Sequence, residues 1–118
     1  MNYLEESSLL VVHRIVPILA LLSQHNKLQM LITLIELAPQ EFTITELHEK
    51  NRYIDRKSSA LALTHLHENG VVKKRIKPTR IANKHLVLWS LSDSREAVIA
   101  KEIAAALLNY ENLANAVK

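Results

Sequence analysis

The chain has 118 residues, 48% of them hydrophobic, which is enough for one globular domain with a buried core. It contains no cysteine, so disulfides, thiolate metal sites and thiol-based sensing are excluded. A single glycine rules out a glycine-rich phosphate loop, and no nucleophile, base and orienting group stand at a catalytic spacing. We therefore expect no enzymatic activity, no cofactor and no metal site.

The net charge of +3 is concentrated in one part of the chain. Residues 50–84 hold ten Lys or Arg and two acidic residues, a net charge of +8, while the remainder carries −5. No acidic residue lies between Glu68 and Asp93. This distribution favours a polyanionic partner, although a charged segment can also serve only to keep a hairpin soluble.

The segment 9–22 is strongly apolar on all sides, which predicts a helix that is buried on more than one face. It is shorter than a membrane span and is interrupted by His13, Arg14 and Pro17. Acidic residues also replace the basic start of a signal peptide, so we expect a cytoplasmic protein without membrane contact. Pro17 should either kink this helix or break it into two.

A second helix is expected over residues 27–38, with Asn26 as its cap and Pro39 as its stop. It carries two apolar stripes, so it should pack between neighbours on both sides. One stripe comprises Leu28, Leu31, Ile32 and Ile35, and the other Met30, Leu34 and Leu37.

Two capped helices follow at helix-turn-helix spacing. Thr43 and Glu46 have the form of a capping box, which predicts a short helix from about Ile44 to Lys50. Asp55 is a good cap for a longer helix, because its carboxylate can accept the N–H groups near Ser58. That helix should end at Asn69-Gly70, since Gly70 adopts a positive φ without a Cβ penalty.

The longer helix has a core face and an outward face. Ser59, Ala62, Leu63 and Leu66 follow the spacing of a buried stripe. Leu61 belongs to the outward face, where it would either contact a thymine methyl group or pack on a neighbouring element. His65 and His67 should point to different sides of the helix, which prevents them from sharing a metal ion.

Residues 71–77 and 85–91 are rich in β-forming side chains and are separated by a turn that begins Pro78-Thr79. They predict a hairpin. A helix-turn-helix followed by a hairpin is a winged helix-turn-helix, so the expected fold class is mainly α with a small β-hairpin (α+β).

Two segments of this region match a known pattern. Leu66-His67-Glu68-Asn69-Gly70-Val71-Val72 corresponds to the end of a recognition helix, and Leu88-Trp89-Ser90-Leu91-Ser92 to an aromatic-x-Leu-Ser/Thr strand end. Through them residues 27–92 resemble the winged-helix repressors of the MarR and ArsR kind. The chain departs from the MarR pattern in the wing, where the usual Asp-x-Arg is missing and only Arg80 remains, and after Leu91, where the customary glycine is absent.

Ser92 or Asp93 is expected to cap a final helix that reaches toward Val117. Its alanine-rich apolar face would either fold back on its own domain or pair with a second subunit, and we favour pairing. In this scheme 1–118 is a single domain, in which 27–91 is the winged helix-turn-helix core and 1–25 and 93–118 are dimerisation helices. The expected interface residues are Leu9, Val12, Val16, Leu19, Ala100, Ile103, Ala104 and Leu107.

The sequence thus predicts a homodimer that binds double-stranded DNA at a near-palindromic operator, most simply a transcriptional repressor. Residues expected to face bases are Lys57, Ser58, Leu61, Thr64 and His65. Residues expected to hold phosphates or enter the minor groove are Arg52, Arg56, Lys73, Arg75, Lys77, Arg80 and Lys84.

Three alternatives stay open at this stage. A plasmid or viral replication or partition protein would use the same DNA-binding chemistry. A protein-interaction module would instead present the basic wing to an acidic partner, and it would have no affinity for duplex DNA. A small-molecule effector is compatible with the first hypothesis, but no residue specifies one.

Overall fold

The computed structural model describes the backbone of residues 11–81 and 83–117, and the side-chain surroundings of these residues up to Tyr110. Along the chain lie a π-helical turn η1 (Val11–Ile15) and the helices α2 (Val16–Leu22), α3 (His25–Leu37), α4 (Ile44–Lys50) and α5 (Arg56–Glu68). The strands β1 (Val72–Pro78) and β2 (His85–Leu91) and the long helix α6 (Arg95–Val117) complete the chain.

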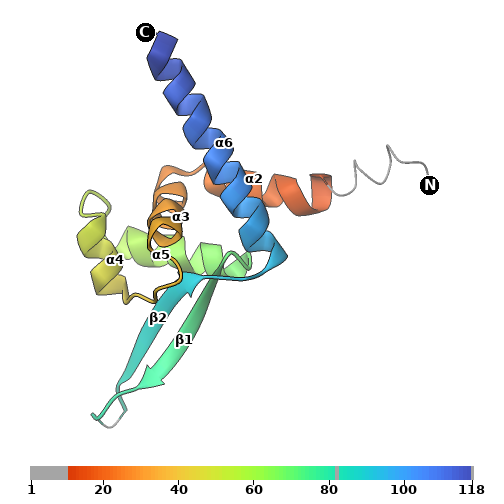
Figure 1. Cartoon of the computed structure of the whole chain (residues 1–118). Helices are drawn as coiled ribbons and strands as arrows, with labels where there is room; N and C mark the ends of the chain where they lie inside the picture. The colour runs from red at the N-terminus through yellow and green to blue at the C-terminus, as the bar shows by residue number, and fades with distance from the viewer. Residues whose placement is uncertain (1–10, 82, 118) are drawn as a thin grey trace, which may run out of the picture.

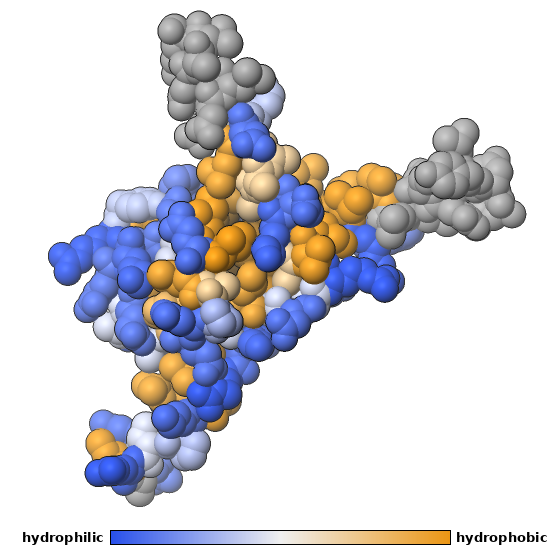
Figure 2. All heavy atoms as spheres, viewed as in Figure 1, coloured by the Kyte–Doolittle hydropathy of each residue, from blue (hydrophilic) through white to orange (hydrophobic). Residues whose placement is uncertain are grey.

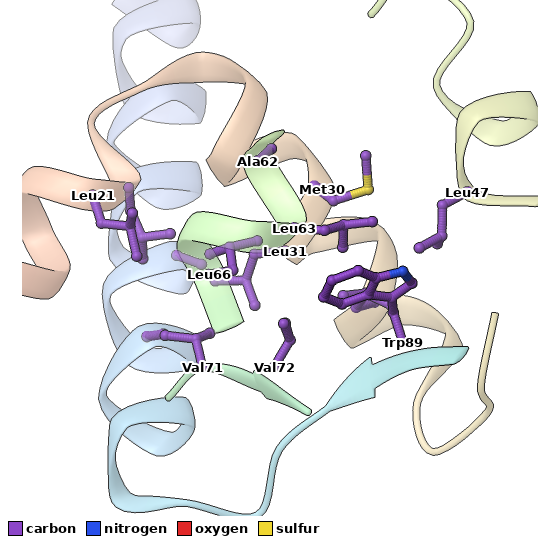
Figure 3. Packing of buried hydrophobic residues seen from close by; sticks show 14 of the residues in the cluster. Leu21, Met30, Leu31, Leu47, Ala62, Leu63, Leu66, Val71, Val72 and Trp89 are labelled. Carbon is purple, nitrogen blue, oxygen red and sulfur yellow. The ribbon is translucent and has the colours of Figure 1, made fainter. Parts of the chain in front are cut away.

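Helix α3 lies at the centre of the molecule. It packs against α5 and α4 on one side and against α2 and α6 on the other, as its two apolar stripes predict (Figure 1). The core is built from large aliphatic side chains of α3 and α5, closed below by the base of the hairpin (Figure 3). Leu31, Leu63 and Leu66 are fully buried there, and Trp89 of β2 covers them from the hairpin side.

The two strands form the predicted antiparallel hairpin, with Val72 opposite Leu91 at its base and Pro78 opposite His85 near its tip. Phe42 extends the sheet by a bridge to Trp89, in which each residue's N–H donates to the other's carbonyl, at 2.9 and 2.7 Å. This bridge connects the α3–α4 loop to β2, and it was not predicted from the sequence.

The N-terminal helical segment is not divided at Pro17. The π-helical turn η1 passes directly into α2, and Pro17 lies in the first turn of α2. A proline lacks the N–H that would bond four residues back, and a local π-helical turn is one way to absorb that missing bond.

Two predicted helix caps are wrong. Helix α3 begins at His25 rather than Lys27, so Asn26 lies inside its first turn. The N-cap residue is Gln24, whose side chain makes no capping hydrogen bond. Helix α6 is capped by Ser94, whose Oγ accepts the N–H of Ala97 at 3.1 Å, and not by Ser92 or Asp93. Ser92 instead supports the turn before α6, because its Oγ accepts the N–H of Ser94 at 3.1 Å.

Candidate nucleic-acid interface

Helix α5 is fixed at both ends by the predicted caps. At its start the Asp55 carboxylate accepts the backbone N–H of Ser58 at 2.8 Å and the Ser58 hydroxyl at 2.9 Å, and these bonds lower the pKa of Asp55. At its end Gly70 has φ of +76°. The N–H groups of Gly70 and Val71 donate to the carbonyls of His67 and Leu66, both at 3.0 Å, which is a Schellman motif. The length and direction of α5 are therefore set by local chemistry.

A buried polar contact holds α4 against α3. The capping box is present, with the Glu46 N–H donating to Thr43 Oγ1 at 3.2 Å and the Thr43 N–H to Glu46 Oε1 at 3.0 Å. At the other end of α4, the buried Asn51 amide donates to the Leu47 carbonyl and to Thr33 Oγ1 of α3, both at 3.1 Å. Helical periodicity relates residues that are only a few positions apart, so it gives no signal for a contact between residues 18 positions apart. The role of Asn51 was therefore not predicted from the sequence.

The core face of α5 is the predicted one, since Ser59, Ala62, Leu63 and Leu66 are all buried. Opposite them, Lys57, Leu61, Thr64 and Glu68 are exposed, and Leu61 leaves 54% of its surface in solvent. The exposed centre of α5 thus carries an ammonium group, a hydroxyl and an apolar side chain, which are the types that read base edges.

The two sides of this exposed face have different neighbours. Ser58 and His65 are half-buried and, with Leu61, line a hollow against residues 24–27, which are the N-cap and first turn of α3. On the hairpin side, His67 Nδ1 donates to the Val72 carbonyl at 3.2 Å. The imidazole ring of His67 lies edge-on to the Trp89 ring, with 6.1 Å between the ring centroids. His65 and His67 therefore point apart, as predicted.

Two residues next to this face, Tyr53 and His25, were not predicted from the sequence to lie there. Tyr53, in the turn between α4 and α5, is 65% exposed, and its ring lies 5.9 Å from that of His25 at the start of α3. His25 also borders the hollow that Ser58 and Leu61 line. The folded chain brings these residues together across 28 positions of sequence, a separation without any periodic signal.

The hairpin projects from the body as an arm (Figures 1 and 2). Only Val72 of β1 is buried, and every residue from Lys73 to Pro78 is exposed. By strand alternation Lys73, Arg75 and Lys77 share one face of the hairpin. Among the residues that the structure describes, Lys77, Arg80 and Lys84 form no ion pair with a carboxylate.

Arg75, predicted to contact phosphate, differs from its neighbours in that it already has a carboxylate partner. Its Nε and Nη2 donate to the two carboxylate oxygens of Glu41, each at 2.8 Å. This bidentate pair joins β1 to the α3–α4 loop, and the Arg75 hydrogen bonds lower the pKa of Glu41. The charge of Arg75 is therefore already balanced, and Lys73 is more weakly paired, with its Nζ 3.8 Å from Asp93 Oδ2.

The terminal helices correct part of the predicted dimer interface. Ala100 and Ala104 are fully buried inside the subunit, because their small side chains let α6 approach α2 and α3 closely. Ile103 and Leu107 are half-buried against the same core. In contrast Val12, Val16 and Leu19 remain 43–53% exposed, while Leu9 lies outside the described residues.

Helix-turn-helix, hairpin and the Phe42 bridge together define a winged helix, which confirms the fold class expected from the sequence. No protein-family profile matches the chain, and no curated protein matches it in sequence. Within the described ranges no helix is both long and apolar enough to cross a membrane.

Solved structures share this fold across nearly the whole chain. The transcriptional repressor BigR from Xylella fastidiosa aligns with a TM-score of 0.66 and 21% identity, over 91% of this chain and 96% of that one. The reduced form of the transcriptional regulator YodB from B. subtilis aligns with a TM-score of 0.59 and 17% identity, over 98% and 92% of the two chains. A possible transcriptional regulator from Methanosarcina mazei Go1 aligns at 0.58 and 12% identity, over 80% and 78%.

Proposed function

We propose that this protein is a dimeric transcriptional regulator, most specifically a repressor, that binds a near-palindromic site in double-stranded DNA. The observation that carries the proposal is the juxtaposition of two surfaces. One is the exposed face of α5, and the other is the basic hairpin that begins two residues after Gly70 and projects beside it. An α-helix fits the major groove, and a projecting hairpin can follow the adjacent backbone.

In this arrangement α5 enters the major groove with Lys57, Leu61 and Thr64 toward base edges. Ser58 and His65 contribute at the edge of the helix nearest the α2–α3 turn. Phosphate contacts come from Arg52 in the turn before α5, from Arg56 at the start of α5, and from Lys77, Arg80 and Lys84 in the wing, all of them exposed. Solved structures named as a transcriptional repressor and a transcriptional regulator share this fold, which supports the proposal.

Dimerisation follows from the surface that the terminal helices leave uncovered. Val11, Val12, Val16 and Leu19 of η1 and α2 are exposed, and apolar side chains also gather over α6 (Figure 2). Contiguous exposed apolar patches of this kind mark interfaces. For two α5 helices to enter successive major grooves, a twofold axis through this surface has to set them roughly 34 Å apart.

Selection from a pool of random duplexes tests this function. The purified protein is expected to enrich an inverted repeat, and the enriched duplex should bind on the order of 10³-fold or more tightly than a shuffled one at physiological salt. Failure to retain any duplex at low salt would refute the proposal in favour of a protein-interaction module.

A further inference from the structure

The tip of the hairpin holds an isoleucine in a fixed backbone setting. The N–H of Ile81 donates to Thr79 Oγ1 at 3.3 Å, and its carbonyl accepts the N–H of Lys84 at 3.2 Å. The Thr79 hydroxyl in turn donates to the Lys84 carbonyl at 2.9 Å. Asn83, with φ of +65°, turns the chain back toward β2. Both backbone polar groups of Ile81 are thus used within the loop.

The side chain of Ile81 has no such setting, because 60% of its surface is exposed. It lies at the end of the molecule farthest along the hairpin, where no core is within reach (Figure 1). Its neighbours Arg80 and Lys84 are also exposed, and Thr79 and Asn83 are neutral. An exposed apolar side chain on a hydrogen-bonded backbone, between two cations, fits a partner that is anionic outside and apolar between its stacked layers, as DNA is at the minor groove.

The hairpin is long enough for this contact. From Val72 to Pro78 the strand rises about 20 Å at roughly 3.4 Å per residue. Half a helical turn of DNA, the distance from a major groove to the next minor groove, is about 17 Å. With α5 in the major groove, the tip therefore reaches the neighbouring minor groove.

We propose that Ile81 is a wedge that enters this minor groove, partly unstacks one base step and bends the DNA. The inference rests on the proposed function and adds a mode of recognition to it. Apolar side chains of several minor-groove proteins act in this way and kink the duplex by about 20–90°. Pyrimidine–purine steps unstack most easily, so such a step is expected beneath each wing.

The hairpin supplies a matched control for the test. Ile76 is 59% exposed, as Ile81 is, but it lies on the shaft of the hairpin in β1 rather than at its tip. Ile81→Ala and Ile76→Ala therefore remove the same atoms from equally exposed positions of one element. Neither substitution touches the core, so both variants should fold.

The experiment uses the duplex enriched in the selection, with 2-aminopurine at the pyrimidine–purine step under the wing and a dye at each end. Wild type and Ile76→Ala should raise the 2-aminopurine fluorescence and shorten the end-to-end distance. Ile81→Ala should lose at least half of both changes while still binding. Equal bending by Ile81→Ala and wild type would overturn the wedge and leave the proposed function standing. Absence of duplex binding by the wild type would instead overturn the proposed function.

Discussion

Gly70 lies between the end of helix α5 and the start of the hairpin. Its φ of +76° lies in the left-handed region, and the three heavy atoms nearest to an added Cβ belong to the Glu96 side chain, at ordinary contact distances of 3.5–3.7 Å. The cost of a side chain therefore comes from the backbone. Gly70→Ala should lower the free energy of unfolding in urea by about 1–2 kcal/mol, and Gly70→Asn by less, because Asn tolerates this conformation. Equal stability of all three proteins would show that this cap does not hold the junction.

Arg75 and Arg80 lie on the same hairpin in different electrostatic settings. The Arg75 guanidinium is bound by Glu41 at 2.8 Å, whereas Arg80 pairs with no carboxylate in the part of the chain described. Each phosphate contact adds about 0.9 to the slope of log K against log salt. Arg80→Ala should therefore flatten the slope by about one, and Arg75→Ala should leave it nearly unchanged. The opposite order, measured by anisotropy titrations at several salt concentrations, would mean that DNA displaces Glu41 from Arg75.

At the scale of the element, α5 should read sequence while the wing supplies general affinity. Lys57 and Thr64 are exposed opposite the buried Leu63 and Leu66, so replacing either by Ala should not affect folding. Each substitution should cost on the order of 1–3 kcal/mol on the selected duplex and little on a shuffled one. Lys101→Ala, on the exposed side of α6, is the control and should change neither. A uniform loss on both duplexes would assign Lys57 and Thr64 to phosphates instead.

The elements of the winged helix were predictable because their signals are local. The Thr43–Glu46 box, the Asp55 cap and Gly70 each act within a few residues, and the core face of α5 follows from helical periodicity. The features missed depend on long-range packing. The Phe42–Trp89 bridge and the Arg75–Glu41 pair join segments that are distant in sequence. The periodic apolar face of α6 does not show whether its own domain or a second subunit will cover it.

The molecule as a whole is more extended than a compact domain of the same length. Its Cα radius of gyration is 16.4 Å, against roughly 13–14 Å for a compact domain of this length. In Figure 1 η1 and the distal part of α6 both project beyond the core. A second subunit would cover the apolar side chains that η1 and α2 expose, which agrees with the proposed dimer.

Charge placed on that surface should separate the subunits. Val12 is 53% exposed on η1, so Val12→Glu leaves the core intact but would bury an unpaired carboxylate in the dimer. Sedimentation at micromolar concentration should give a dimer for the wild type and a folded monomer for Val12→Glu. Ile76→Glu adds the same charge to the wing and should remain a dimer. A wild type that sediments as a monomer would exclude the twofold model.

The proposal that a dimer reads successive major grooves with α5 is tested most directly by its affinity for two duplexes. One carries two inverted half-sites about ten base pairs apart, and the other has five further base pairs inserted between the half-sites. We predict that two chains bind each short duplex and that affinity for the lengthened duplex is at least tenfold lower. The reason is that five base pairs, half a helical turn, rotate the second half-site to the opposite side of the DNA. Equal affinity for both duplexes, or no preference over a shuffled duplex, would contradict a dimer that reads successive major grooves with α5.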